Sequence, residues 1–173
     1  GQQPQIGGWN VARLLEAMVP MMDEPESLHQ VLDAYIGALE EHHNNMWATK
    51  LGLDVFTASD EPLIQDLNAL LQEVETDMTI FFRLLCSIES PHIDSISDAF
   101  YDSSTVPTDE WNSWLQRWWL RTDGSPDRPA MRKANPKYVL RNWMAQLAIN
   151  AAESGDFSVA EQLYILLQNP YDE

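Results

Sequence analysis

The sequence predicts an all-α protein, an irregular bundle of about seven to eight amphipathic helices with no significant sheet. Apolar residues recur at positions i, i+3, i+4 and i+7 along most of the chain, which is the helical period. No segment alternates apolar and polar residues as a half-buried strand does, and Gly or Pro separates the periodic segments. The absence of a fixed repeat argues against a regular solenoid. We treat residues 1–173 as a single helical region, with a possible subdivision at 121–134.

Two helices are predicted in the first part of the chain. The first spans residues 9–19 and breaks near Pro20, which cannot continue a helix. Pro25 opens a longer helix that extends toward Leu51, with Gly52 as its stop. Its apolar residues follow the helical spacing without a miss: Leu28, Val31, Leu32, Tyr35, Ile36 and Leu39.

Two more helices are predicted from their capping residues. Ser59 or Asp60 can accept hydrogen bonds from the free N–H groups of a third helix, and Thr76 or Asp77 from those of a fourth, which Pro91 ends. The apolar stripe of the third helix is regular: Leu63, Ile64, Leu67, Leu70, Leu71 and Val74. Both helices therefore present one face to a core.

A tryptophan-rich helix follows a short helix at 93–101, in which Ile96 and Phe100 point inward. Thr108 caps the tryptophan-rich helix, whose apolar face consists of Trp111, Trp114, Leu115, Trp118 and Trp119. Stacked indoles can bind bases or sugars. The helical spacing favours a core instead, with a docking surface for another domain as the next alternative. Because residues 121–134 contain one Gly and two Pro, we interpret them as an irregular connector.

A helical hairpin completes the chain. Asn135 caps its first helix and Pro136 occupies the first turn, where a missing N–H costs nothing. Apolar residues then recur at helical spacing from Val139 to Ala151. Gly155 suits a left-handed stop, and the next residue, an aspartate, can cap the last helix.

Composition excludes several classes of partner. The chain has a formal net charge of −17, so it would repel nucleic acid and anionic membrane surfaces. No apolar run is long enough to span a bilayer.

The first ten residues lack a signal peptide and indicate a cut inside a longer protein, with a trimmed tag as the alternative. Cys86, the single cysteine, lies in an apolar run and is predicted to be a buried, inert thiol of an intracellular protein.

Positive charge is concentrated in one segment. Seven of the ten basic residues lie within 117–141, where only two aspartates oppose them. This segment either packs beside the chain's own acidic helices or faces a missing partner or phosphate. The residues that we expect to contribute to docking or to local electrostatics are Arg132, Lys133, Lys137 and Arg141.

No active site is visible. Glu26 and His29 repeat the spacing of Glu40 and His43, and bundles with two metal ions use such pairs. On one helix these pairs lie about 21 Å apart, so they indicate a solvated face, and a metal-binding bundle is only a third hypothesis. Because the motifs of phosphate loops, nucleophile elbows and zinc sites are absent, we predict no catalytic, cofactor-binding or metal residue.

Several stretches occur in the order of a known family. They are QPQIGGWN, DMTIFFRLL with the pattern Asp-x-Thr-x-Phe-Phe-Arg, the helix from Trp111 to Arg121, and NPKYVLRN followed by GDF and NPYDE. Together they resemble the C-terminal end of the selenoprotein O (YdiU) family of kinase-like protein adenylyltransferases, a pseudokinase group. Trp143 stands where this family usually has Tyr, a change consistent with the same core role.

The resemblance implies that the parent protein uses ATP and Mg²⁺ or Mn²⁺ to transfer AMP to Ser, Thr or Tyr hydroxyls of proteins. Its catalytic residues would lie upstream of residue 1, so this fragment would need no cofactor. The implied partners are the upstream kinase-like domain and protein substrates, in the bacterial cytoplasm or alternatively the mitochondrion. The chain would then be a non-catalytic C-terminal region that supports the core. A stand-alone helical interaction module without enzymatic activity is the alternative.

Overall fold

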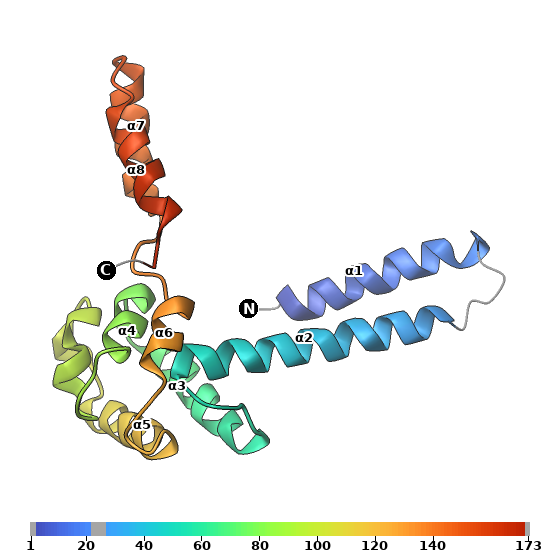
Figure 1. Cartoon of the computed structure of the whole chain (residues 1–173), viewed down its shortest axis with the longest axis horizontal. Helices are drawn as coiled ribbons and strands as arrows, with labels where there is room; N and C mark the ends of the chain where they lie inside the picture. The colour runs from blue at the N-terminus through green and yellow to red at the C-terminus, as the bar shows by residue number, and fades with distance from the viewer. Residues whose placement is uncertain (1–2, 22–26, 172–173) are drawn as a thin grey trace. The chain divides into compact units, whose positions relative to one another are not determined.

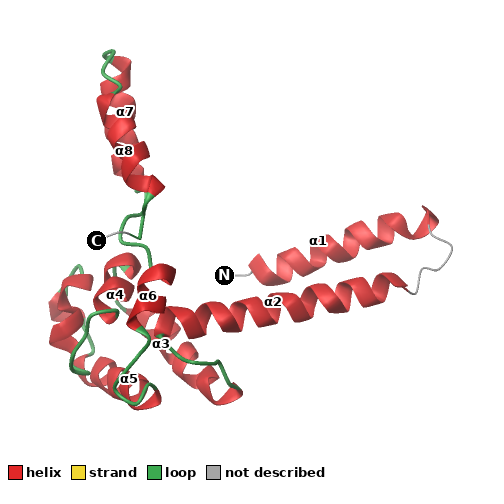
Figure 2. Cartoon of the chain, viewed as in Figure 1, coloured by secondary structure: helices red, strands yellow, loops and turns green. Residues whose placement is uncertain are grey.

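The computed structural model describes residues 3–21 and 27–171, which form eight α-helices and four short 3₁₀ helices but no strand (Figures 1 and 2). The one β-type pairing in this part of the chain is an isolated bridge between Thr76 and Phe100. The all-α prediction is therefore confirmed. The chain divides into two compact units, Gly1–Met46 and Trp47–Glu173, and the segment 121–134 belongs to the second.

The first unit pairs α1 (Gln3–Met18) with the first part of α2 (Ser27–Leu51), and Figure 1 shows the two side by side. A β-carbon on Gly7 would lie 2.7 Å from the Tyr35 hydroxyl oxygen, so glycine permits this close approach. The helix α1 starts at Gln3, before the predicted residue 9. It ends before the 3₁₀ turn η1 (Val19–Met21), which confirms the predicted break. The predicted helix start at Pro25 lies outside the described residues.

The core of the second unit lies between α3 (Glu61–Glu73), α4 (Met78–Leu85), the 3₁₀ helix η3 (Ile93–Ala99) and α5 (Thr108–Arg121). The fully enclosed residues of α5 are Trp111, Trp114, Leu115 and Trp118, each 0% exposed. Two of their indole N–H groups donate to distant carbonyls, that of Trp114 to Leu63 O at 2.8 Å and that of Trp118 to Leu51 O at 2.9 Å. The tryptophan stripe is thus core, as predicted.

Helix ends confirm some capping predictions and correct others. Asp77 caps α4, since its Oδ1 accepts from the N–H groups of Thr79 and Ile80. Gly52 ends α2 with φ at 67°, also as predicted. Asp60, however, does not cap α3. Its carboxylate accepts from the Thr57 backbone N–H and hydroxyl, across the 3₁₀ turn η2 (Ala58–Asp60).

Two further local predictions were wrong. Thr108 is the first residue of α5 rather than its cap, and its hydroxyl donates to Val106 O just after the 3₁₀ turn η4 (Ser103–Thr105). The helix α4 ends at Leu85, well before Pro91, because the Ser87 backbone N–H closes a tighter turn on Leu84 O.

The predicted connector contains a helix, α6 (Arg128–Ala134). Asp127 Oδ1 caps it through the Ala130 N–H at 3.0 Å, and Pro129 sits in the first turn, where no N–H partner is required. Asn135 follows α6 and is 0% exposed, so it does not cap the C-terminal hairpin. Its side chain instead exchanges hydrogen bonds with Lys50, from Nδ2 to Lys50 O at 3.0 Å and from Lys50 Nζ to Oδ1 at 2.8 Å.

The last two helices, α7 (Asn142–Glu153) and α8 (Ser158–Gln168), pack against each other (Figure 1). Gly155 ends α7 with φ at 88°, as predicted, and Asp156 Oδ1 accepts from the first N–H of α8 at 2.9 Å. The helix α7 starts at Asn142, later than its apolar spacing suggested, because residues 136–141 are not helical. The core role expected for Trp143 was wrong, because many large apolar side chains of this hairpin are exposed: Trp143, Leu147, Ile149, Phe157, Tyr164 and Ile165.

Candidate functional site

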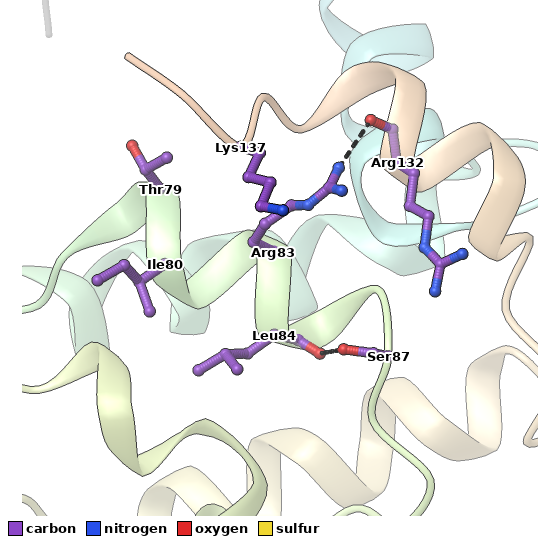
Figure 3. Close-up of a pocket in the computed structure, with 7 residues that line it drawn as sticks. All are labelled: Thr79, Ile80, Arg83, Leu84, Ser87, Arg132 and Lys137. Carbon is purple, nitrogen blue, oxygen red and sulfur yellow. Dashed lines mark hydrogen bonds between the residues drawn. The ribbon is translucent and has the colours of Figure 1, made fainter. Parts of the chain in front are cut away.

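A basic pocket lies in the second unit, between α4 and the chain around α6 (Figure 3). Its volume is about 380 Å³. Among the lining residues that the structure describes, three are cationic and none is acidic. The lining consists of Thr79, Ile80, Arg83, Leu84, Ser87, Arg132 and Lys137. We call this cavity the basic pocket.

Arg83 is held in place by backbone carbonyls. Its Nη1 donates to Arg132 O at 3.3 Å and to Asn135 O at 3.2 Å, at the C-terminal end of α6. Helix C-termini carry partial negative charge, so a guanidinium is favoured there. These bonds fix α6 to α4 and hold a positive charge at the wall of the pocket.

Lys137 reaches the pocket from the other side. The backbone N–H groups of Lys137 and Tyr138 both donate to Pro170 O, at 2.8 and 3.1 Å, and so fix this extended segment. The Lys137 ammonium lies 5.4 Å from the centre of the Tyr138 ring. In the view of Figure 3 the side chains of Lys137 and Arg83 cross, whereas that of Arg132 points away from both. Arg83, Arg132 and Lys137 thus all line the same cavity.

Asp77 joins the start of α4 to the segment before α7. Arg141 Nη2 lies 2.8 Å from each Asp77 carboxylate oxygen, and the Tyr101 hydroxyl donates to Oδ2 at 3.3 Å. Burial raises the pKa of Asp77, but hydrogen bonds from the Ile80 N–H and from Arg141 outweigh it and lower this pKa below its ordinary value. The Asp77 carboxylate therefore stays ionised and neutralises Arg141.

The structure separates the four basic residues that the sequence singled out. Arg132 and Lys137 line the basic pocket, Lys133 is exposed and is not part of the lining, and Arg141 pairs with Asp77. Their role in docking stays a prediction. The sequence did not single out Arg83, because this residue lies far from the basic segment. The one local signal for Arg83 is that it is the single cation in the apolar run of α4.

The single cysteine lies in the interior, as predicted. Cys86 is 1% exposed, and its thiol donates to Phe82 O at 3.0 Å. Burial raises the pKa of Cys86, which keeps the thiol protonated and unreactive. Lys50, whose pKa burial lowers, lies with its ammonium 4.1 Å from the centre of the Phe82 ring. The contact between Lys50 and Phe82 joins the end of α2 to α4.

The histidine and glutamate pairs do not form a site in the part of the chain that the structure describes. Glu26 lies outside it, and among residues 3–21 and 27–171 no group of three or more His, Cys, Asp or Glu side chains is placed to hold a metal ion. Within the same ranges, no helix combines the length and hydropathy required to cross a membrane.

Comparison with known proteins gives a consistent result. The family described as protein adenylyltransferase SelO matches residues 1–168. The protein nucleotidyltransferase YdiU of Aromatoleum aromaticum is 42% identical over 182 residues, which cover 100% of this chain and 35% of the relative. The protein of the same name from Flavobacterium johnsoniae is 41% identical over 186 residues, covering 100% of this chain and 36% of the relative. The protein of the same name from Rhodopirellula baltica is 37% identical over 196 residues, covering 99% of this chain and 36% of the relative.

Proposed function

Because this chain belongs to the protein adenylyltransferase SelO family, we propose that it is the non-catalytic, C-terminal helical part of an AMP-transferring protein. The observation that carries the proposal is the extent of the match. The family covers residues 1–168, yet the chain spans only 35% of the length of its Aromatoleum relative. In this proposal the complete protein transfers AMP from ATP to Ser, Thr or Tyr hydroxyls of other proteins.

The proposed task of the chain is to support a kinase-like core. Transfer of AMP requires charge neutralisation and positioning of the phosphate chain, which the core would supply with ATP and Mg²⁺ or Mn²⁺. The helical region would hold that core in its active arrangement. Two surfaces of the second unit support this role: the basic pocket and the exposed apolar side chains of the α7–α8 hairpin.

The proposed partners are the kinase-like domain and the protein substrates of the complete enzyme. The formal net charge of −17 argues against nucleic acid and anionic membranes as partners, because phosphate attraction would have the wrong sign. We place the complete protein inside the cell, in the bacterial cytoplasm, with the mitochondrion as the alternative compartment.

A second candidate function is a stand-alone helical interaction module without enzymatic activity. The exposed apolar side chains of the hairpin, such as Trp143 at 64% and Tyr164 at 67%, favour a protein-binding surface. The gene distinguishes the two candidates. A reading frame that starts near Gly1 supports the module, and several hundred upstream codons with a kinase-like pattern support the enzyme.

Replacing the four basic residues with glutamine in the complete protein tests the supporting role. We expect the quadruple variant Arg132→Gln, Lys133→Gln, Lys137→Gln and Arg141→Gln to fold but to transfer AMP about tenfold more slowly, a loss of about 1.4 kcal/mol in transition-state stabilisation. The rate is measured with labelled ATP and a protein substrate.

The matched control is Arg117→Gln. Arg117 belongs to the same basic segment but pairs with Asp66 at 2.7 Å, on helices α5 and α3. Circular dichroism establishes that each variant is folded. A quadruple variant with unchanged ATP affinity and unchanged AMP transfer would remove these residues from the proposed function.

A further inference from the structure

The hairpin of α7 and α8 has little packing of its own. No residue that the structure describes within these two helices is buried. Even the most covered residues of α7, such as Met144 and Ala148, are only partly buried. Short helices are marginal in water unless tertiary packing stabilises an apolar face. The hairpin therefore has the properties of an element that another surface covers.

The apolar surface of α7 extends around most of the helix. Successive residues of a helix lie about 100° apart, so Leu147 and Ile149 point in nearly opposite directions. Both are nevertheless exposed, at 54% and 50%. The polar residues of α7 form one narrow stripe: Asn142, Gln146, Asn150 and Glu153. Apolar residues occupy the remaining arc of about 240°, whereas the apolar stripe of a surface helix is typically little wider than about 100°.

The helix α8 also exposes apolar residues in more than one direction. Tyr164 and Ile165 are neighbours in the sequence, so they point about 100° apart, and they are 67% and 64% exposed. A helix that is apolar nearly all round is usually enclosed by other parts of a protein. We therefore expect cover on both sides of the hairpin rather than on one.

Charge is depleted along the hairpin. Three of the 27 residues in 142–168 are charged, all of them acidic, whereas 21% of the whole chain is charged. Depletion of charge together with exposed aromatic residues is typical of the centre of a protein interface. Helices that lie on membranes instead carry Lys and Arg on their polar face, and the polar stripe of α7 has neither. The composition thus favours a protein surface over a lipid surface.

Net charge argues against a second copy of the chain as the partner. Each copy has a formal net charge of −17, so two copies repel one another as they approach. A different source of cover is the rest of a longer protein. The chain spans only 35% of the length of its Aromatoleum relative and 36% of that from Flavobacterium. The remainder of such a protein is therefore the partner that these observations favour.

We propose that the α7–α8 hairpin inserts into an apolar cleft of the remainder of the complete protein. In this arrangement the remainder covers Trp143 and Leu147 on one side of α7 and Ile149 on the other. The polar stripe of α7 stays at the solvent. The inference rests on the proposed function for the existence of that remainder, but it does not depend on any AMP transfer.

The test compares amide hydrogen exchange in the complete protein and in the 173-residue chain. We expect the amides of α7 and α8 to exchange at least about tenfold more slowly in the complete protein, because an enclosed helix opens less often. In the complete protein, Leu147→Asp and Ile149→Asp should each speed this exchange about tenfold, because an unpaired carboxylate is costly to bury.

The matched control is Asn150→Asp, which places the same charge on the polar stripe of α7. The new carboxylate can still accept the hydrogen bond that Gln146 Nε2 donates to Asn150 Oδ1 at 2.8 Å. In the complete protein this variant should exchange within about twofold of the unmodified form, as expected for an exposed position. In the 173-residue chain all three substitutions should have equally small effects, because each replaces an exposed side chain.

Three results would overturn the inference. Equal exchange of the hairpin in the complete protein and in the 173-residue chain would show that the remainder does not cover it. Protection that Ile149→Asp leaves intact would restrict the cover to one side. A dimer of the 173-residue chain in sedimentation, with exchange that slows as its concentration rises, would identify a second copy as the partner.

The same experiment separates this inference from the proposed function. A complete protein that protects the hairpin but transfers no AMP would contradict the proposed function and support the insertion. A complete protein that transfers AMP while the hairpin exchanges freely would contradict the insertion alone.

Discussion

Trp118→Ala is expected to lower the free energy of unfolding of the second unit by about 4 kcal/mol. The indole is 0% exposed, and its ring lies nearly parallel to that of Trp114, with an interplanar angle of 2° and centroids 6.3 Å apart. Its N–H donates to Leu51 O at 2.9 Å and so ties α5 to the end of α2. The substitution would leave a large cavity and a buried carbonyl without its donor.

Chemical denaturation followed by far-ultraviolet circular dichroism measures this effect. The matched control is Trp143→Ala in α7, because Trp143 is 64% exposed and should contribute about 0.5 kcal/mol or less. A loss below about 1 kcal/mol for Trp118→Ala would contradict a core centred on the tryptophan stripe.

Asp60→Ala is expected to lower the free energy of unfolding by about 3–5 kcal/mol, the usual consequence of breaking a buried ion pair. Asp60 is 2% exposed and accepts from Arg121 Nε at 2.6 Å and Nη2 at 3.1 Å. It also accepts from the Thr57 N–H and hydroxyl, each at 2.8 Å. Removing this carboxylate leaves Arg121 Nε and the Thr57 backbone N–H without the partner described here, whereas Arg121 Nη2 keeps Val55 O and the Thr57 hydroxyl keeps that of Ser59.

The same carboxylate gives a pH dependence of defined sign. Burial raises the pKa of Asp60, but the hydrogen bonds from Arg121 and Thr57 outweigh it and lower this pKa below the model-compound value of 3.8. The stabilisation is therefore fully present above the pKa of the unfolded chain and is lost as pH falls through the folded value. In Asp60→Ala this part of the acid sensitivity should disappear.

Urea denaturation at a series of pH values measures both effects. Asp66→Ala is the matched control, because Asp66 pairs with Arg117 at 2.7 Å across a surface where both side chains are about half exposed. Such pairs contribute about 0–1 kcal/mol. If Asp60→Ala cost no more than Asp66→Ala, the Asp60–Arg121 pair would not stabilise the fold as the structure indicates.

Periodicity alone predicted the helices that bury one face and expose the other. The spacing of Trp111, Trp114 and Trp118 matches the face that the structure encloses. Local rules failed where a distant partner decides the outcome. Asn135 has the composition of a helix cap, yet it is buried against Lys50, which lies 85 residues earlier. Pro129 was treated as a breaker, although the first turn of a helix accepts proline.

The basic pocket was predictable only in part. Clustering of charge in the sequence identified Arg132 and Lys137, two of its three cations. Arg83 lies 49 residues before Arg132, and its approach to the end of α6 depends on tertiary packing that no local pattern contains. The pairing of Arg141 with Asp77, 64 residues apart, was hidden for the same reason.

Incubation with labelled ATP tests the central claim most directly, that this helical region supports AMP transfer without performing it. The assay compares the 173-residue chain with the complete protein, each with Mg²⁺ or Mn²⁺ and a protein substrate. We expect the complete protein to attach AMP to hydroxyl side chains and the chain by itself to attach none. Robust labelling by the 173-residue chain without the remainder of the protein would contradict the account.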